Sequence, residues 1–218
     1  MLEIFYAIPS INKERCESCF SMWKGLGYKT AVLLDKGKPA PVNADLVTEV
    51  DPYGGYYQSF IQLHKVIGDS ADIIITGGDD ILPDPREAEE LGQEFFEHFP
   101  DGFGVMQPLG DNMVGADTIC ASPWFGKGWL KRAYRGKHPV WPGYIAFYGD
   151  QELREITKKM GVLWQRWDVN QYHHHWSRQG GPAKLDYQTK NDGFWKQDEK
   201  LYYERKQNNW PGHEPLSG

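Results

Sequence analysis

The sequence has few cysteines, no long apolar run and no excess of positive charge. Its three cysteines, Cys16, Cys19 and Cys120, include one C-x-x-C pair, and without a second pair they do not make up a zinc site. No apolar stretch approaches the roughly 20 residues of a membrane-spanning helix, and the chain does not open on a signal peptide. These absences predict a soluble, cytoplasmic protein without a membrane partner.

The net charge is negative, −6 over 218 residues. This argues against a generic binder of nucleic acid or anionic membranes, because both classes use a basic surface to neutralise phosphate. The basic run from Lys127 to Lys137 is an exception, and it indicates either a solvated surface or a local patch for an anion. Hydrophobic residues make up 40% of the chain, which suffices for the core of one domain.

Strand and helix patterns alternate along the first half of the chain. Three consecutive isoleucines, Ile73 to Ile75, indicate a strand buried on both faces, as in a parallel sheet. The expected strands cover residues 3–8, 30–34, 46–50, 72–76, 105–107, 118–121 and 162–164. The expected helices cover residues 56–67, 150–160 and 198–206. Two more helices are expected to begin after the capping residues Asn12 and Asp84. This alternation predicts an α/β domain with a mostly parallel sheet in residues 1–178. A C-terminal extension, residues 179–218, is expected to wrap on that domain or to be partly flexible.

Gly77-Gly78-Asp79-Asp80 follows the isoleucine strand directly. In an open parallel sheet, ligands bind beyond the C-terminal ends of the strands. Two carboxylates there can hold a hard divalent cation, and the glycines let a phosphate or a ribose approach the backbone. A plain turn with one Asp capping the next helix is the alternative, but Asp84 already serves that helix.

Three consecutive histidines, His173 to His175, come much later in the chain. Adjacent residues on a strand point to opposite faces, so His173 and His175 can share one face. A neutral imidazole is a good ligand for Mn²⁺ or a similar metal. Solvated or stacking histidines are an equally good interpretation of the run.

Two further carboxylates lie at the ends of expected elements. Asp150 opens a helix, where the helix dipole keeps a carboxylate ionised and able to take a proton from a hydroxyl; taken alone, a plain helix cap is the simpler interpretation. Asp35 ends the second expected strand, where it can accept a hydrogen bond from a base or a ribose, or serve as a turn residue before Gly37.

The order of these features resembles the GT-A fold of glycosyltransferases, most closely the inverting family-two glycosyltransferases. Residues 7–12 are similar to that family's T-x-P-x-x-N opening, Asp35 to its base-contacting Asp, and residues 72–80 to the strand that leads into the Asp-x-Asp metal motif. Residues 122–126 resemble the acceptor-side segment, residues 149–153 the Glu-Asp-x-x-Leu segment, and the histidines the late metal ligand. Glycine replaces the first Asp of the metal motif and, at Gly149, the Glu before the catalytic Asp.

The resemblance implies a metal-dependent transfer, with inversion, from a nucleotide sugar to an acceptor hydroxyl. The expected donor is a UDP-sugar, the cation is Mn²⁺ or Mg²⁺, and the acceptor is a glycan, a protein or a hydroxylated DNA base. The resemblance implies that Asp150 is the catalytic base, with Glu152 as the second candidate. The residues implied to bind the donor are Ala7, Ile8, Pro9, Asp35, Gly77, Gly78 and Asp79, and those implied to bind the metal are Asp79, Asp80, His173 and His175. The residues implied to bind the acceptor are Trp124, Phe125 and Trp129.

Two other classes compete with this interpretation. A nucleotidyltransferase that makes nucleotide sugars shares the α/β core, but it needs a glycine-rich phosphate loop after the first strand, and residues 7–13 contain no glycine. A non-catalytic metal- or sugar-binding module is the third possibility.

Overall fold

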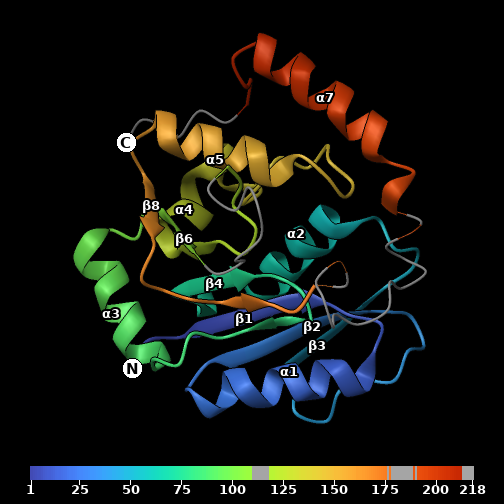
Figure 1. The fold of residues 1–218 in the computed structure, drawn as a ribbon, viewed down its shortest axis with the longest axis vertical. Coiled ribbons are helices and arrows are strands. Elements are labelled where there is room, and N and C mark those ends of the chain that lie inside the picture. Colours follow the sequence, from blue (N-terminus) through green and yellow to red (C-terminus); the bar gives the residue numbers. More distant parts are fainter. Residues whose placement is uncertain (110–117, 176, 178–188, 190, 213–218) are drawn as a thin grey trace.

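A seven-stranded sheet lies at the centre of this computed structural model, which describes residues 1–109, 118–175, 177, 189 and 191–212 (Figure 1). The strand order is β3-β2-β1-β4-β7-β6-β8. The strands are β1 (Ile4–Pro9), β2 (Lys29–Asp35), β3 (Leu46–Val50), β4 (Ile73–Thr76), β6 (Val105–Pro108), β7 (Trp124–Gly126) and β8 (Leu163–Arg166). The first four are parallel, and β7 is antiparallel to both β4 and β6. The predicted α/β class with a mostly parallel sheet is confirmed.

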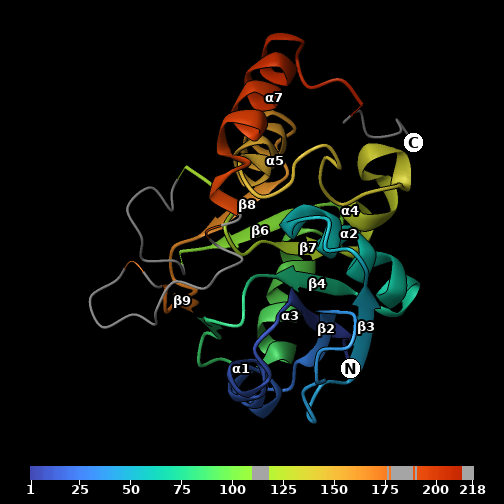
Figure 2. The ribbon, with the colours of Figure 1, turned by 90° about the vertical axis from the view of Figure 1, so that its right-hand side faces the viewer.

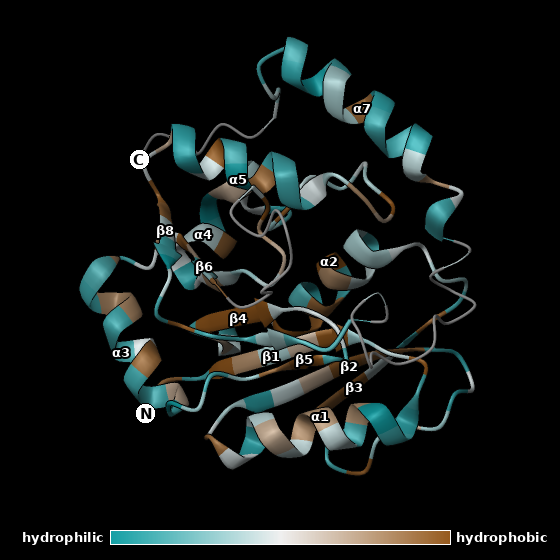
Figure 3. Ribbon diagram, viewed as in Figure 1, coloured by the Kyte–Doolittle hydropathy of each residue, from teal (hydrophilic) through white to brown (hydrophobic). Residues whose placement is uncertain are grey.

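Helices cover both faces of this sheet. They are α1 (Lys13–Gly25), α2 (Tyr56–Ile67), α3 (Ala88–His98), α4 (Lys127–Arg132) and α5 (Gly149–Lys159), and a further helix, α7 (Trp195–Gln207), packs on the outside of α5. One core holds buried residues of α1 and α3, and the other holds those of α2, α4 and α5. Ile74 points into the second core while Ile73 and Ile75 point into the first, so β4 is apolar on both faces (Figure 3). No helix among the described residues is long and apolar enough to cross a membrane.

Several predicted elements differ from the structure. Asn12 caps α1 as expected, accepting a hydrogen bond from the Arg15 amide at 3.0 Å. Asp84, however, caps no helix: its carboxylate accepts from the Asn170 amide and pairs with Arg86, and α3 begins only at Ala88. No strand forms at residues 118–121. The strand lies instead at β7, which is buried between β4 and β6.

A second, two-stranded sheet joins distant parts of the chain. It pairs β5 (Ile81–Leu82) with β9 (Tyr172–His173) in antiparallel register, with Ile81 opposite His173 (Figure 2). The His174 amide also donates to the Asp80 carbonyl at 2.7 Å. The histidine run is thereby placed beside the two aspartates that follow β4.

The C-terminal extension includes helix α7, which packs against α5 (Figure 1). Its Arg205 forms a buried ion pair with Glu152 of α5, and its Tyr202 is also buried. The expected boundary between residues 178 and 179 lies outside the described residues.

Candidate active site

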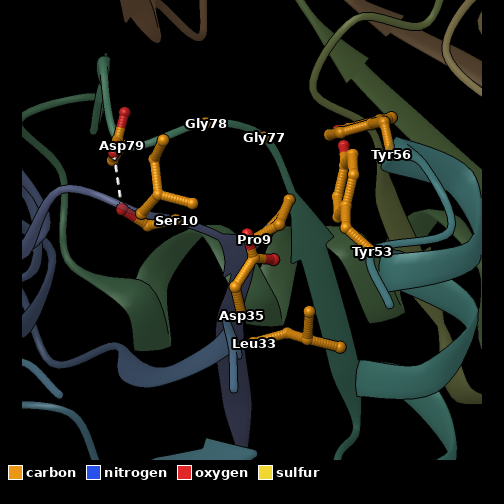
Figure 4. Close-up of a pocket in the computed structure, with 10 residues that line it drawn as sticks. Pro9, Ser10, Leu33, Asp35, Tyr53, Tyr56, Gly77, Gly78 and Asp79 are labelled. Atoms are coloured by element: carbon orange, nitrogen blue, oxygen red, sulfur yellow. Dashed lines mark hydrogen bonds between the residues drawn. The ribbon is translucent and has the colours of Figure 1, made fainter. Parts of the chain in front are cut away.

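Two adjoining cavities open beyond the C-terminal ends of the parallel strands. The smaller, of about 110 Å³, is lined by residues at the ends of β1, β2 and β4, among them Pro9, Asp35 and Gly77 (Figure 4). The larger, of about 530 Å³, is lined by Asp80, Asp150 and two of the histidines. Tyr56, Gly77 and Gly78 line both cavities. This is the position in which open α/β sheets bind their ligands.

The two glycines are required by close packing at the turn after β4. A Cβ at Gly77 would lie 2.6 Å from the Tyr6 hydroxyl, and one at Gly78 would lie 2.7 Å from an Asp80 carboxylate oxygen. The Tyr6 hydroxyl in turn donates to the Gly78 carbonyl at 2.6 Å. Side chains at these positions would therefore displace both the tyrosine and Asp80.

Asp79 is held by residues at the start of α1. Its carboxylate accepts a hydrogen bond from the Ser10 hydroxyl at 2.6 Å (Figure 4) and one from Arg15 Nε at 2.8 Å. A second guanidinium nitrogen of Arg15 also pairs with Asp79, and it lies 3.3 Å from Asp80. Burial raises the pKa of Asp79, and Arg15 and Ser10 offset only part of this effect. The sequence analysis did not single out Arg15, although an arginine in the first turn of the helix after β1 could have indicated a partner for a carboxylate at the strand ends.

Asp80 contacts the histidine run. Its Oδ1 lies 3.3 Å from His173 Nε2, and the His173 and His175 rings are 4.9 Å apart. Burial opposes ionisation of Asp80, but the hydrogen bond and charge of His173, aided by Arg15, outweigh it and lower the pKa of that carboxyl. His173 and His175 both line the larger cavity, whereas His174 does not. No group of three or more His, Cys, Asp or Glu within the described part of the chain is arranged to hold a metal ion.

Asp150 lies half-buried at the N-terminal end of α5, facing the larger cavity. The Tyr57 hydroxyl donates to its Oδ1 at 3.3 Å and accepts from its amide at 2.9 Å. Burial, and secondarily the charge of Asp150, raise the pKa of Tyr57, so the phenol stays a neutral donor. Gly149 is needed here, because a Cβ would lie 2.6 Å from the Tyr57 ring. The tyrosine thus fixes the carboxylate at the cavity wall.

Glu152 does not face either cavity, which contradicts its prediction as a second catalytic base. Its side chain is 1% exposed and lies in the core. Its carboxylate accepts from the Tyr144 hydroxyl at 2.7 Å and from Arg205 at 2.7 and 2.6 Å. These contacts give Glu152 a structural role between α5 and α7.

All three predicted acceptor residues and two of the predicted donor residues lie in the core. Trp124 and Trp129 are 0% and 1% exposed, and their indole N–H groups donate to Gln171 and to the Pro139 carbonyl. Phe125 is equally buried and contributes to the inner wall of the larger cavity. Ala7 and Ile8 lie within β1 with their side chains in the two cores. The end of β1 instead lines the smaller cavity with Pro9, Ser10 and Ile11.

The strand order, the helices on both faces and the position of the cavities define the GT-A fold of glycosyltransferases. Two solved structures of Drosophila β1,4-galactosyltransferase 7 are similar to this chain. The catalytic domain in complex with xylobiose superposes with a TM-score of 0.50 at 15% identity, covering 87% of this chain and 79% of that one. A mutant in complex with manganese, UDP-Gal and xylobiose gives a TM-score of 0.51 at 13% identity, with the same coverage.

A nucleotidyltransferase is less similar to the chain. It is the 4-diphosphocytidyl-2C-methyl-D-erythritol synthase from Anaerococcus prevotii, with a TM-score of 0.48 at 11% identity, covering 89% of this chain and 96% of that one. No model of a known protein family matches the chain, and no curated protein matches it. The similarity to the two galactosyltransferase structures, at 15% and 13% identity, shows the fold alone.

Proposed function

We propose that the chain is a glycosyltransferase that moves a sugar from a UDP-sugar to an acceptor hydroxyl with inversion. The observation that supports this most is the meeting of Asp80, His173 and Asp150 at one cavity beyond the strand ends. The smaller cavity beside it, with Asp35 in its wall, suits the nucleoside of the donor. There Asp35 would accept a hydrogen bond from a base N–H or a ribose hydroxyl.

Asp80 and His173 would supply two ligands to a divalent cation of the Mn²⁺ or Mg²⁺ type. A carboxylate oxygen and an imidazole nitrogen 3.3 Å apart, Asp80 and His173, form a donor pair that suits Mn²⁺, and His175 lies beside them. Asp79 is the weaker candidate, because Ser10 and Arg15 already engage both of its oxygens. When bound, the cation supplies positive charge that stabilises the leaving diphosphate.

In the proposed reaction, Asp150 takes the proton of the acceptor hydroxyl. The hydroxyl oxygen then bonds to the anomeric carbon from the side opposite the diphosphate, while the bond from that carbon to the phosphate oxygen breaks and its electrons leave with UDP. Attack from the opposite side inverts the anomeric configuration. Tyr57 orients Asp150 by its hydrogen bond and excludes water from one side of the carboxylate.

A donor screen tests the proposal. Purified protein is incubated with a panel of UDP-sugars and Mn²⁺, and thermal shift and release of UDP are measured with and without the metal. We expect a metal-dependent rise in melting temperature and slow release of UDP by hydrolysis. Pyrophosphate release from UTP and a sugar 1-phosphate would point to a nucleotidyltransferase instead, and binding without turnover of either substrate would point to a binding module.

Replacing His173 tests the metal pair without relying on activity. His173→Gln is expected to remove most of the rise in melting temperature that Mn²⁺ produces, because the imidazole nitrogen beside Asp80 is lost. His174→Gln is the matched control, since that neighbouring side chain does not line the cavity, and its response to Mn²⁺ should equal that of the wild type. An equal response of both variants would contradict the assignment.

A further inference from the structure

Helix α7 brings an aromatic side chain from the end of the chain to the larger cavity. Trp195, the first residue of the helix, lines this cavity and is 45% exposed. Its ring lies 4.8 Å from that of Phe147 and 5.2 Å from that of Tyr148, and both neighbours line the same cavity. An exposed tryptophan held against two other rings presents a flat apolar surface toward the space beside Asp150.

The same helix fixes the segment that precedes Asp150. Asp198, which is fully buried, accepts hydrogen bonds from three consecutive backbone amides, those of Ile145, Ala146 and Phe147, at 2.9 to 3.2 Å. The Tyr148 hydroxyl donates to Glu199 at 2.8 Å. A wall fixed in this way before a ligand binds avoids the entropy loss of ordering it afterwards. Hydrogen bonds therefore join the helix that carries Trp195 to the segment that leads into Asp150.

The charges that line the larger cavity restrict the chemical class of the acceptor that it can bind. Its lining, as far as the structure describes it, contains the acidic residues Asp80 and Asp150 and no Lys or Arg. The basic run on α4 lies elsewhere and is neutralised in part, because Lys127 pairs with Asp72 and Arg132 with Asp101. A nucleic acid or another polyanion needs cations along its path. The lining favours an uncharged ligand with an apolar face.

We propose that Trp195, backed by Phe147, is the platform of an acceptor subsite that takes a neutral sugar ring. This inference rests on the proposed function. One face of a pyranose consists largely of C–H groups, which pack on an aromatic ring, while its hydroxyl groups remain free for polar partners. A ring stacked on Trp195 presents a hydroxyl to the cavity that Asp150 faces. The subsite selects a carbohydrate acceptor over a DNA base or a peptide.

The test compares acceptor use by three variants. The donor is the UDP-sugar that the wild type hydrolyses fastest, and the acceptors are xylobiose, cellobiose and lactose, a serine- and threonine-containing peptide, and an oligonucleotide with 5-hydroxymethylcytosine. Trp195→Ala should raise the KM for the preferred sugar about tenfold, with a smaller change in the KM for the donor, and Trp195→Phe should restore much of the loss. Trp167→Ala is the control, since this tryptophan is 55% exposed and lines neither cavity.

The outcomes separate this inference from the proposed function. Wild-type release of UDP without transfer to any sugar, or transfer to the oligonucleotide or the peptide alone, overturns the sugar subsite and leaves the transferase standing. An unchanged sugar KM in Trp195→Ala, with α7 intact by circular dichroism, also overturns it. Absence of UDP release from every donor contradicts the proposed function itself and this inference with it.

Discussion

Asp150→Asn is expected to lower sugar transfer about 10³-fold, the usual contribution of a general base, while donor binding stays nearly unchanged. The amide oxygen of the new side chain can still accept from Tyr57 and from the Gln151 amide, so the local structure is retained. Only the capacity to take a proton is lost. Transfer is measured by product formation under saturating donor, and donor binding by calorimetry.

Glu152→Gln is the matched control for this experiment. It neutralises a carboxylate two residues further along α5 that points into the core and contacts no cavity. Per folded molecule, its transfer rate should stay close to that of the wild type. A large loss in Glu152→Gln together with wild-type turnover in Asp150→Asn would reverse the two roles.

Arg205→Met is expected to destabilise the fold by about 3–5 kcal/mol, because it leaves the Glu152 carboxylate buried without its cation. For a chain of this length, that corresponds to a fall in melting temperature of roughly 10 °C. Arg205 also lies 3.5 Å from the centre of the Trp141 ring, a contact that the methionine side chain partly replaces. Thermal unfolding followed by circular dichroism measures the effect.

Two further variants identify the cause of the expected loss of stability in Arg205→Met. The double variant Glu152→Leu, Arg205→Met removes both charges and should lower the free energy of unfolding less than Arg205→Met alone does. This holds although the Tyr134 and Tyr144 hydroxyls lose their acceptor. Lys206→Ala breaks a neighbouring ion pair, with Glu155, that is partly exposed, and it should lower the free energy of unfolding by less than about 1 kcal/mol. Equal losses in Lys206→Ala and Arg205→Met would mean that burial of the pair is not what matters.

The features that the sequence predicted correctly are local. The isoleucine run marks β4 because burial on both faces needs apolar residues at every position. Asn12 marks the start of α1 because its side chain accepts from a backbone amide only three residues away, in the first turn of the helix. The glycine–aspartate turn and Asp150 could be placed because both lie at the ends of such locally recognisable elements.

The features that it missed depend on contacts between distant residues. Glu152 resembles a surface helix residue until Arg205, 53 positions later, is known to lie beside it. The resemblance places Trp124 and Trp129 at the acceptor, since nothing in the neighbouring sequence shows that β7 is inserted between β4 and β6 and that both side chains are buried. Asp84 looks like a helix cap, but its carboxylate is taken by the Asn170 amide. In each case a partner remote in sequence overrides the local preference.

The small sheet of β5 and β9 has a consequence for local stability. It is the only pairing among the described strands that links the turn after β4 to the segment around His173, and each strand has just two residues. So short a ladder is expected to open more readily than the main sheet. An ion shared by Asp80 and His173 would hold it closed, adding about 2.7 kcal/mol to the cost of opening at a concentration 100 times the dissociation constant. Amide hydrogen exchange at His174, whose amide donates to the Asp80 carbonyl, would then slow when Mn²⁺ is added, while exchange in β1 and β2 would not change.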